Sequence, residues 1–101
     1  MTYSIEIASE ALKEWAKLDA SVKRQAVRKL ETLLENPRVP SAALRDMPDC
    51  YKIKLRSAGF RIIYKVIEQR LVILIVAAGK RDSTTADIYA TARRRVRDRS
   101  G

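Results

Sequence analysis

Three basic residues, Lys52, Lys54 and Arg61, stand in two neighbouring runs of alternating character. The first run, YKIKLR, places Lys52 and Lys54 between apolar residues, and the second, RIIYKVI, begins with Arg61. Successive side chains of a β-strand point to opposite faces, so each run has one apolar face and one basic face. The pattern predicts a β-hairpin over residues 51–67 with a row of cations on one side.

The turn of this hairpin decides which residues lie opposite one another. Gly59 tolerates a positive φ angle, so Ala58 and Gly59 are the predicted two-residue turn. Arg56 then lies opposite Arg61, and Arg61 shares the face of the two lysines. Like charges side by side across a sheet destabilise it by roughly 0.2–1 kcal/mol per pair. A polyanionic partner is the simplest compensation.

Arg81 and Tyr89 are two further candidates. Arg81 follows the run LVILIVAAGK, whose apolar residues are typical of a central strand buried on both faces. In a twisted sheet the end of this strand lies close enough to the hairpin for Arg81 to join Lys52, Lys54 and Arg61. Tyr89 belongs to the predicted last helix and is expected to lean over these cations.

These residue types suit the cleavage of a phosphodiester. One lysine helps to deprotonate a ribose 2′-hydroxyl, arginines stabilise the charge that develops on the phosphorane, and a second lysine protonates the leaving oxygen. Clustered cations lower one another's pKa, so a lysine here is expected to exchange protons near neutral pH. RNA carries its own nucleophile, and the scheme requires no metal ion. A phosphate-binding surface without catalysis is the alternative, and the spacing alone favours it.

Composition narrows the chemistry further. The 101 residues include 21 lysines and arginines against 12 aspartates and glutamates, a formal net charge of +9 that indicates nucleic acid or another acidic partner. The chain has no histidine and one cysteine. A His-based catalytic triad, a zinc site and an internal disulfide are therefore excluded, and no metal or other cofactor is expected.

The elements that must position these residues follow from the periodicity of the rest of the chain. Residues 2–7 alternate like a strand, apolar residues then recur at helical spacing in two successive segments, and a connection with all three prolines leads to the hairpin. Candidate helix caps are Ser9, then Asp19 or Ser21, and finally residues 82–84. The order β-αα-βββ-α predicts an α+β fold with a mostly antiparallel four-stranded sheet, an N-terminal helical hairpin and a C-terminal helix.

Three local expectations concern single residues and the chain end. In the second predicted helix, Val22, Ala26 and Leu30 form part of an apolar stripe, whereas basic residues such as Lys29 are expected to face water. Gly79 is expected to end the apolar strand. The arginine-rich C-terminal residues are expected to fray.

The sequence resembles the RelE-type toxins of bacterial toxin–antitoxin pairs. The resemblance lies in ALKEWAKLD, LRDMPDCYKIKLRSAGFRIIYKVI and VAAGKRD, which follow in matching order over nearly the whole chain. It implies the RelE/ParE fold and a ribosome-dependent endoribonuclease that cuts messenger RNA in the ribosomal A site. The family's functional lysines match Lys52 and Lys54, and its two arginines match Arg61 and Arg81 without a gap. Tyr89 matches the catalytic tyrosine, although it lies further from the arginine than in the closest family pattern.

The resemblance also implies partners. These are a RelB-like antitoxin encoded beside the toxin, the 70S ribosome with its A-site mRNA, and operator DNA bound only through the antitoxin complex. One departure from the family is Asp46, which stands where close relatives usually have glycine, in the loop before the hairpin.

Two rival functions remain open at the level of sequence. A ParE-like toxin shares this fold but poisons DNA gyrase, and such toxins generally lack the set of two lysines and two arginines. A basic RNA-binding or ribosome-binding module without catalysis would need only the composition.

The sequence has neither the pattern of a membrane span nor that of a signal peptide. No apolar run reaches the roughly 18 residues that a membrane span needs. The N-terminus, MTYSIEIASE, lacks the basic start and apolar middle of a signal peptide. The sequence therefore predicts a soluble cytoplasmic protein with one toxin domain over residues 1–101 and no membrane partner.

Overall fold

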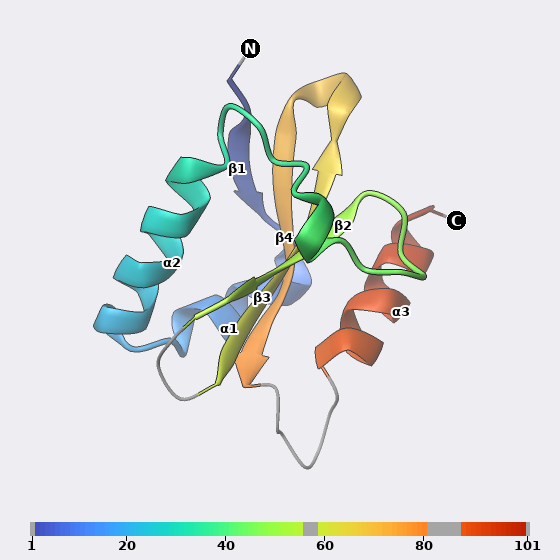
Figure 1. Cartoon of the computed structure of the whole chain (residues 1–101). Helices are drawn as coiled ribbons and strands as arrows, with labels where there is room; N and C mark the ends of the chain where they lie inside the picture. The colour runs from blue at the N-terminus through green and yellow to red at the C-terminus, as the bar shows by residue number, and fades with distance from the viewer. Residues whose placement is uncertain (1, 56–58, 81–87, 101) are drawn as a thin grey trace.

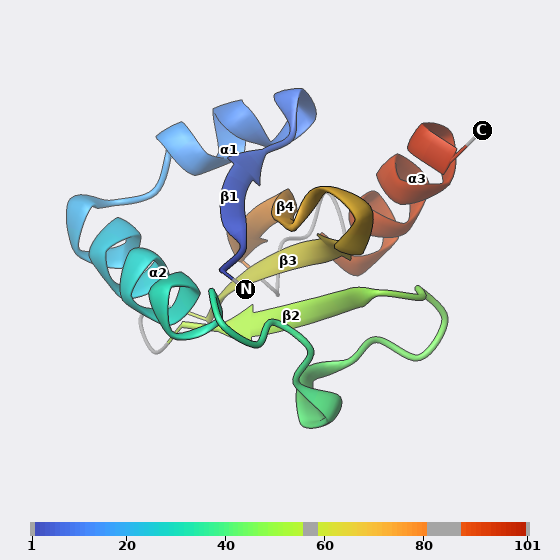
Figure 2. The ribbon, with the colours of Figure 1, turned by 90° about the horizontal axis from the view of Figure 1, so that it is seen from above.

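The computed structural model describes residues 2–55, 59–80 and 88–100, without the side chains of residues 99 and 100. These residues form a four-stranded sheet with helices on both faces (Figures 1 and 2). The predicted α+β architecture is confirmed. In their order across the sheet, the strands are β1 (Ser4–Ile7), β4 (Val72–Lys80), β3 (Phe60–Ile67) and β2 (Cys50–Lys54).

Helices α2 and α3 lie on opposite sides of the sheet, and α1 packs against β4 (Figure 2). A 3-10 turn over Ser9–Ala11 precedes α1. None of the helices described is long and apolar enough to span a membrane. The bounds of these helices are Leu12–Ala16 for α1, Ala20–Thr32 for α2 and Ile88–Ser100 for α3.

The apolar stripe of α2 explains how this helix packs. Val22, Ala26 and Leu30 recur at helical spacing and are all buried, as predicted. Asp19 is the N-cap residue, but its side chain makes no capping hydrogen bond. Packing of the stripe, rather than the cap, therefore holds α2 on the sheet.

Strand β4 forms the centre of the fold. Every residue from Val72 to Ala78 is buried, as the apolar run predicted. The strand pairs antiparallel with β3 and parallel with β1. The sheet is therefore mixed, because α1 and α2 carry the chain away from β1 and the crossover allows β4 to run in the same direction. Gly79 does not end the strand, since β4 continues through Lys80.

The β2–β3 hairpin forms with a different register from the predicted one. Lys54, in place of Arg56, lies opposite Arg61, and the Leu55 N–H donates to the Phe60 carbonyl at 3.0 Å. The loop is therefore longer than two residues, and the pairing is shifted by two positions (56 − 54). A shift by an even number keeps every side chain on its face. The prediction that Arg61 shares the face of the lysines is confirmed.

Backbone conformation marks the two turns around β3. Gly59 has a φ of 68°, as expected for the turn residue of the hairpin. Leu71 has a φ of 53° and follows a 3-10 turn over Glu68–Arg70 that leads into β4. At the C-terminus the arginine-rich segment does not fray but belongs to α3, which extends to Ser100. The predicted caps at residues 82–84 lie outside the described residues.

Candidate active site

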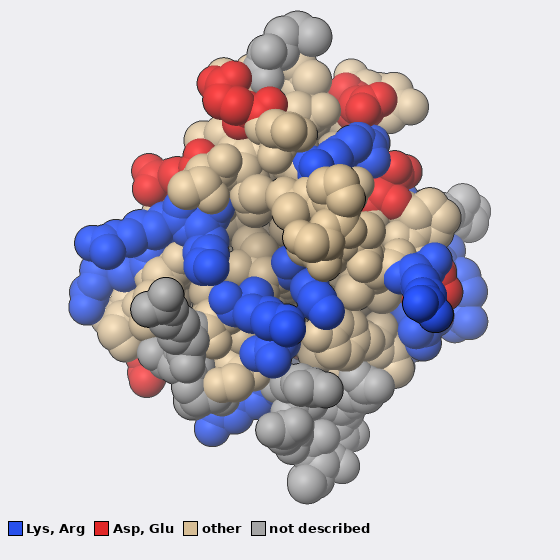
Figure 3. Space-filling view, viewed as in Figure 1, with Lys and Arg blue, Asp and Glu red and all other residues tan. Residues whose placement is uncertain are grey.

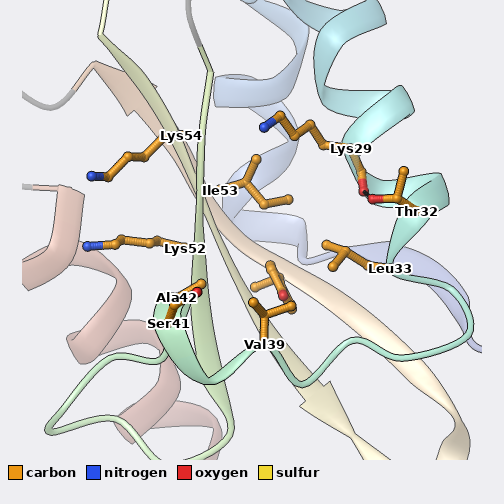
Figure 4. A pocket seen from close by; sticks show the side chains of 10 residues that line it. Lys29, Thr32, Leu33, Val39, Ser41, Ala42, Lys52, Ile53 and Lys54 are labelled. Atoms are coloured by element: carbon orange, nitrogen blue, oxygen red, sulfur yellow. Dashed lines mark hydrogen bonds between the residues drawn. The ribbon is translucent and has the colours of Figure 1, made fainter.

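Lys52, Lys54 and Arg61 lie on one face of the hairpin, next to its turn. Lys52 pairs across the sheet with Ile63, and Lys54 pairs with Arg61. Figure 4 shows both lysines pointing to one side of β2 and Ile53 pointing to the other. Lys54 is exposed, whereas Lys52 and Arg61 are half-buried. The backbone that positions all three is a paired sheet, so their relative placement is rigid.

The guanidinium of Arg61 is incompletely bonded. Its Nη1 donates to the Phe60 carbonyl at 3.1 Å, while its buried Nε has no hydrogen-bond partner among the residues that the structure describes. An unsatisfied buried donor costs about 1–3 kcal/mol, and in native proteins such groups are rare. Lys52 and Lys54 make no ion pair with any residue that the structure describes. The face therefore presents three cations to which the described part of the chain offers no carboxylate.

Four arginines elsewhere in the fold are bonded to carboxylates. Arg38 donates to Asp49 at 2.8 Å, to Glu68 at 3.1 Å and to the Tyr51 hydroxyl at 3.3 Å. These bonds, that to Asp49 first, raise the pKa of Arg38. Further pairs between arginine and a carboxylate are Arg70 with Glu6, Arg93 with Asp46 and Arg95 with Glu14. Arg24 and Arg28 also make no ion pair with a described residue, but both are exposed, whereas the Nε of Arg61 is buried.

Tyr89 lies in the first turns of α3, half-buried against the core. Helix α3 is held by Arg95, which donates to both oxygens of Glu14 on α1 at 2.9 Å and to the Val76 carbonyl at 2.9 Å. The Glu14 carboxylate, its nearest partner, raises the pKa of Arg95. Glu14 also accepts from the Ala78 N–H at 3.1 Å. This clasp fixes the helix that carries Tyr89 to the end of β4.

A β-bulge makes this clasp possible. Ile63 pairs with Ala77 and Tyr64 pairs with Ile75, so Val76 has no partner on β3. Strand β1 ends at Ile7, which pairs with Ile75. The clasp bonds backbone groups of β4 beyond this point, which β1 does not cover. Glu14 and Arg95 were not among the residues singled out from the sequence, because only the folded topology brings positions 14, 76 and 95 together.

Arg81 lies outside the described residues, but the end of the strand that leads to it is described. Lys80 pairs with Phe60 and Gly79 pairs with Arg61. The Lys80 ammonium lies 5.7 Å from the centre of the Phe60 ring. The described part of β4 therefore ends beside Arg61, at the turn end of the hairpin.

Asp46, the departure from the family pattern, has a partner in α3. Its carboxylate lies 2.7 Å from Arg93, and both side chains are about half exposed, at 61% and 49%. An exposed pair of this kind contributes at most about 1 kcal/mol. It links the loop before the hairpin to α3, at a distance from the lysine face.

Sequence reasoning missed Lys29. Lys29 is exposed, as expected, but it was not singled out as a site residue; Figure 4 shows its side chain extending from α2 toward β2. Figure 3 shows lysine and arginine side chains over both elements, with a hollow between them. Helical spacing was a usable signal, because Lys29 lies one turn before Leu33, which packs against the core.

The arrangement can bind a phosphodiester and exchange protons with it. Arginine binds phosphate through parallel N–H donors, and lysine can act as an acid or, when neutral, as a base. Among the described residues, no three His, Cys, Asp or Glu side chains gather in a way that would hold a metal ion.

Comparison with known proteins assigns the chain to a family. Residues 5–84 match the model of the family described as ParE toxin of type II toxin–antitoxin system, parDE. A putative RelE-like toxin protein of Escherichia coli is 47% identical over 96% of this chain and 100% of its own length. The mRNA interferase toxin RelE of E. coli strain K12 is 44% identical over 95% of this chain and 99% of its own.

Solved structures give the same result. A mutant of the E. coli toxin RelE in the free state has a TM-score of 0.84 and 43% identity, over 94% of this chain and 98% of that one. RelE in the intact E. coli RelBE toxin–antitoxin complex has a TM-score of 0.76 and 46% identity, over 80% and 99%. The family model and these relatives agree over most of the chain. The protein therefore belongs to the RelE/ParE family of toxins from type II toxin–antitoxin systems.

Proposed function

We propose that this protein is the toxin of a type II toxin–antitoxin system and an mRNA interferase, which cuts messenger RNA in the ribosomal A site and so inhibits translation. The observation that carries the proposal is the set of cations at the turn end of the hairpin that have no carboxylate partner in the described part of the chain, above all Arg61, whose buried Nε has no partner there. The 44% identity to RelE supports the same activity. The domain that acts spans residues 1–101.

The groups that transfer protons and bind the phosphate come from this chain, and the nucleophile comes from the RNA. The ribose 2′-oxygen attacks phosphorus and loses its proton with the help of Lys52, which acts as base or charge stabiliser. Lys54 gives a proton to the 5′-oxygen as its bond to phosphorus breaks. Arg61 and Arg81 bind the phosphate oxygens in the transition state, and Tyr89 stacks on or orients a base. The products are a 2′,3′-cyclic phosphate and a 5′-hydroxyl.

The ribosome supplies what the site lacks. With no histidine in the chain, the site has no strong base at neutral pH. An mRNA held in line by the ribosome compensates, because a fixed geometry removes much of the entropic barrier. We therefore expect free RNA to be cut poorly. The ribosome as site of action places the toxin in the cytoplasm.

The partner that controls the toxin is a RelB-like antitoxin. The solved E. coli complex pairs RelE with RelB, and a net charge of +9 favours an acidic antitoxin. Operator DNA is bound through that complex. The antitoxin is expected to block entry to the A site by its bulk, since Lys52, Lys54 and Arg61 are fixed on the sheet and the clasp holds α3, which carries Tyr89.

The rival is gyrase inhibition, because the matching family model is named for ParE. The deciding experiment maps the 3′ ends of mRNA on programmed ribosomes with wild type and Lys54→Ala, beside a gyrase supercoiling assay. We expect A-site cuts with cyclic or 3′-phosphate ends for wild type, strongly reduced for Lys54→Ala, and unchanged supercoiling. Inhibited gyrase with intact mRNA would establish the rival function. Ribosome binding without cuts would indicate a module without catalysis.

A further inference from the structure

A hollow lies between α2 and the outer edge of β2, beside the proposed active site (Figures 3 and 4). Its volume is about 360 Å³, at the lower end of the range for small-ligand pockets. Three of its lining residues are basic and most of the others are aliphatic. The lining includes Lys29 of α2, Leu33 at the C-terminal end of α2, Val39 of the connection, and Lys52, Ile53 and Lys54 of β2.

Lys29 has no structural partner that explains its position. Its side chain extends across the hollow toward β2 (Figure 4), although the residue is exposed. In the described part of the chain Lys29 makes no ion pair, and none of the lining residues is acidic. Lys29 is the basic side chain that extends over the hollow, whereas Lys52 and Lys54 border it and point to the other side of β2 (Figure 4). With this lysine over it and no acidic lining residue, the hollow is complementary to an anion.

We infer that this hollow binds a nucleotide of the RNA strand adjacent to the cleaved phosphodiester. The inference rests on the proposed function and names a subsite of the same reaction. Leu33, Val39 and Ile53 offer aliphatic surface to the face of a base, and the Lys29 ammonium binds the phosphate of that nucleotide. Both parts of a nucleotide, the apolar base and the anionic phosphate, thus have a counterpart among the residues that line the hollow.

The path of the strand follows from the two sides of β2. Lys52 and Lys54 point to one side of this strand, whereas Ile53, Leu33 and Lys29 lie on the other (Figure 4). β2 is an edge strand of the sheet. The RNA therefore crosses the edge of β2, with the cleaved phosphate at the lysine pair and its neighbour in the hollow.

The first test does not depend on cleavage. A short single-stranded RNA with a 2′-deoxy sugar at the cleavage position is titrated into the full chain, and the methyl NMR signals of Leu33 and Val39 are followed. Both signals are expected to move for wild type and for Arg28→Ala, and to remain in place for Lys29→Ala. Arg28 is the matched control, because it is exposed and lies roughly 100° away around the helix. Signals that stay fixed in wild type, or that still move with Lys29→Ala, would overturn the subsite.

The second test places the subsite in the reaction. On programmed ribosomes, Lys29→Ala is expected to raise the half-saturating toxin concentration about fivefold to tenfold and to lower the salt slope by about 1, with the saturated cleavage rate retained. This loss should disappear on an mRNA with a neutral methylphosphonate at one phosphate next to the cleaved one. If Lys29→Ala still weakens binding on every such mRNA, Lys29 contacts ribosomal RNA instead of the mRNA. If Arg28→Ala weakens binding equally, the effect reflects the total positive charge of the helix and not a specific contact of Lys29. Either result contradicts the inference.

A failure of the proposed function gives a different result. In that case wild type cuts no mRNA at all, and the titration with 2′-deoxy RNA still decides whether the hollow binds a nucleotide. An antitoxin segment as the true occupant would shift the Leu33 and Val39 signals where the RNA does not, and would overturn the inference.

Discussion

The two ends of the β2–β3 hairpin differ in how completely an arginine is hydrogen-bonded. At one end Arg38 donates to Asp49, Glu68 and Tyr51, and Tyr51 stacks on Tyr64 with ring centres 5.5 Å apart. At the turn end the buried Nε of Arg61 has no partner among the described residues.

The difference separates stability from function. A bonded arginine ties segments of the fold together, whereas an unsatisfied buried donor costs stability and is retained where a ligand can bind it. The end near Arg38, called the closed end below, therefore stabilises the hairpin. The turn end, at Arg61, is available to bind a phosphate. Variants at either end, or at the clasp of α3, should therefore change stability, cleavage or both in a predictable way.

The largest effect is expected for a lysine at the turn end. Lys54→Ala should lower the single-turnover cleavage rate by about 10²–10⁴-fold, because it removes the general acid. Lys65→Ala is the matched control, since Lys65 lies on the same face at the closed end, opposite Cys50. Quench-flow kinetics on programmed ribosomes compare the two variants. Equal losses would show that only the total charge of the face matters.

Alkaline pH should weaken the closed end. Burial, as the main cause, raises the pKa of the Cys50 thiol to about 11 from its ordinary value of 9.0. Because the folded-state pKa is the higher one, the stabilisation is complete below pH 9 and is lost as the pH rises through 11. Urea unfolding should show a loss on the order of 2 kcal/mol across this window. The loss should be smaller for Cys50→Ala, and an identical pH profile for that variant would exclude Cys50 as its source.

A smaller effect is expected where the clasp meets the sheet. Glu14→Gln removes the carboxylate that Arg95 bonds at 2.9 Å and should lower the free energy of unfolding by about 1–2 kcal/mol. Trp15, the one tryptophan of the chain, adjoins Glu14, so its fluorescence reports on this packing. Cleavage should fall only through Tyr89. In a Tyr89→Ala background, Glu14→Gln should therefore add no further loss of rate, and additive losses would disprove the coupling.

The smallest effect concerns one hydroxyl of the closed end. The buried Tyr64 hydroxyl donates to the Pro37 carbonyl at 2.9 Å, and Tyr64→Phe removes this bond. Thermal unfolding should show a loss of about 1 kcal/mol, with cleavage unchanged. A fall in cleavage without a fall in stability would place Tyr64 in the active site. It would also contradict the assignment of the closed end to stability alone.

The sequence predicted the faces of the hairpin better than its register. Alternation alone placed Lys52, Lys54 and Arg61 on one side, and a shift by two residues did not disturb that result. The register itself depends on the loop, and a two-residue turn at Ala58 and Gly59 was only one of the loops that the glycine permits.

Contacts between distant segments were not predictable in the same way. The clasp of Arg95 on Glu14 involves backbone groups of β4 beside the bulge at Val76. Such a bulge cannot be recognised in a continuous apolar sequence. Lys29 is exposed, as expected for a helical charge run, but the sequence did not show that it lines a hollow, because that depends on the position of β2 beside α2. The sequence likewise could not show which lysines and arginines are paired with carboxylates, because these pairs form only in the folded chain.

The most direct test crosses two arginine variants with two measurements. Arg61→Ala should lower the cleavage rate by about 10²–10³-fold without lowering the free energy of unfolding. Arg38→Ala should lower the free energy of unfolding by about 1 kcal/mol and leave the cleavage rate within about twofold of wild type. The opposite pattern, in which Arg61→Ala destabilises the fold but still cuts mRNA at the wild-type rate, would contradict the assignment of the turn end to catalysis.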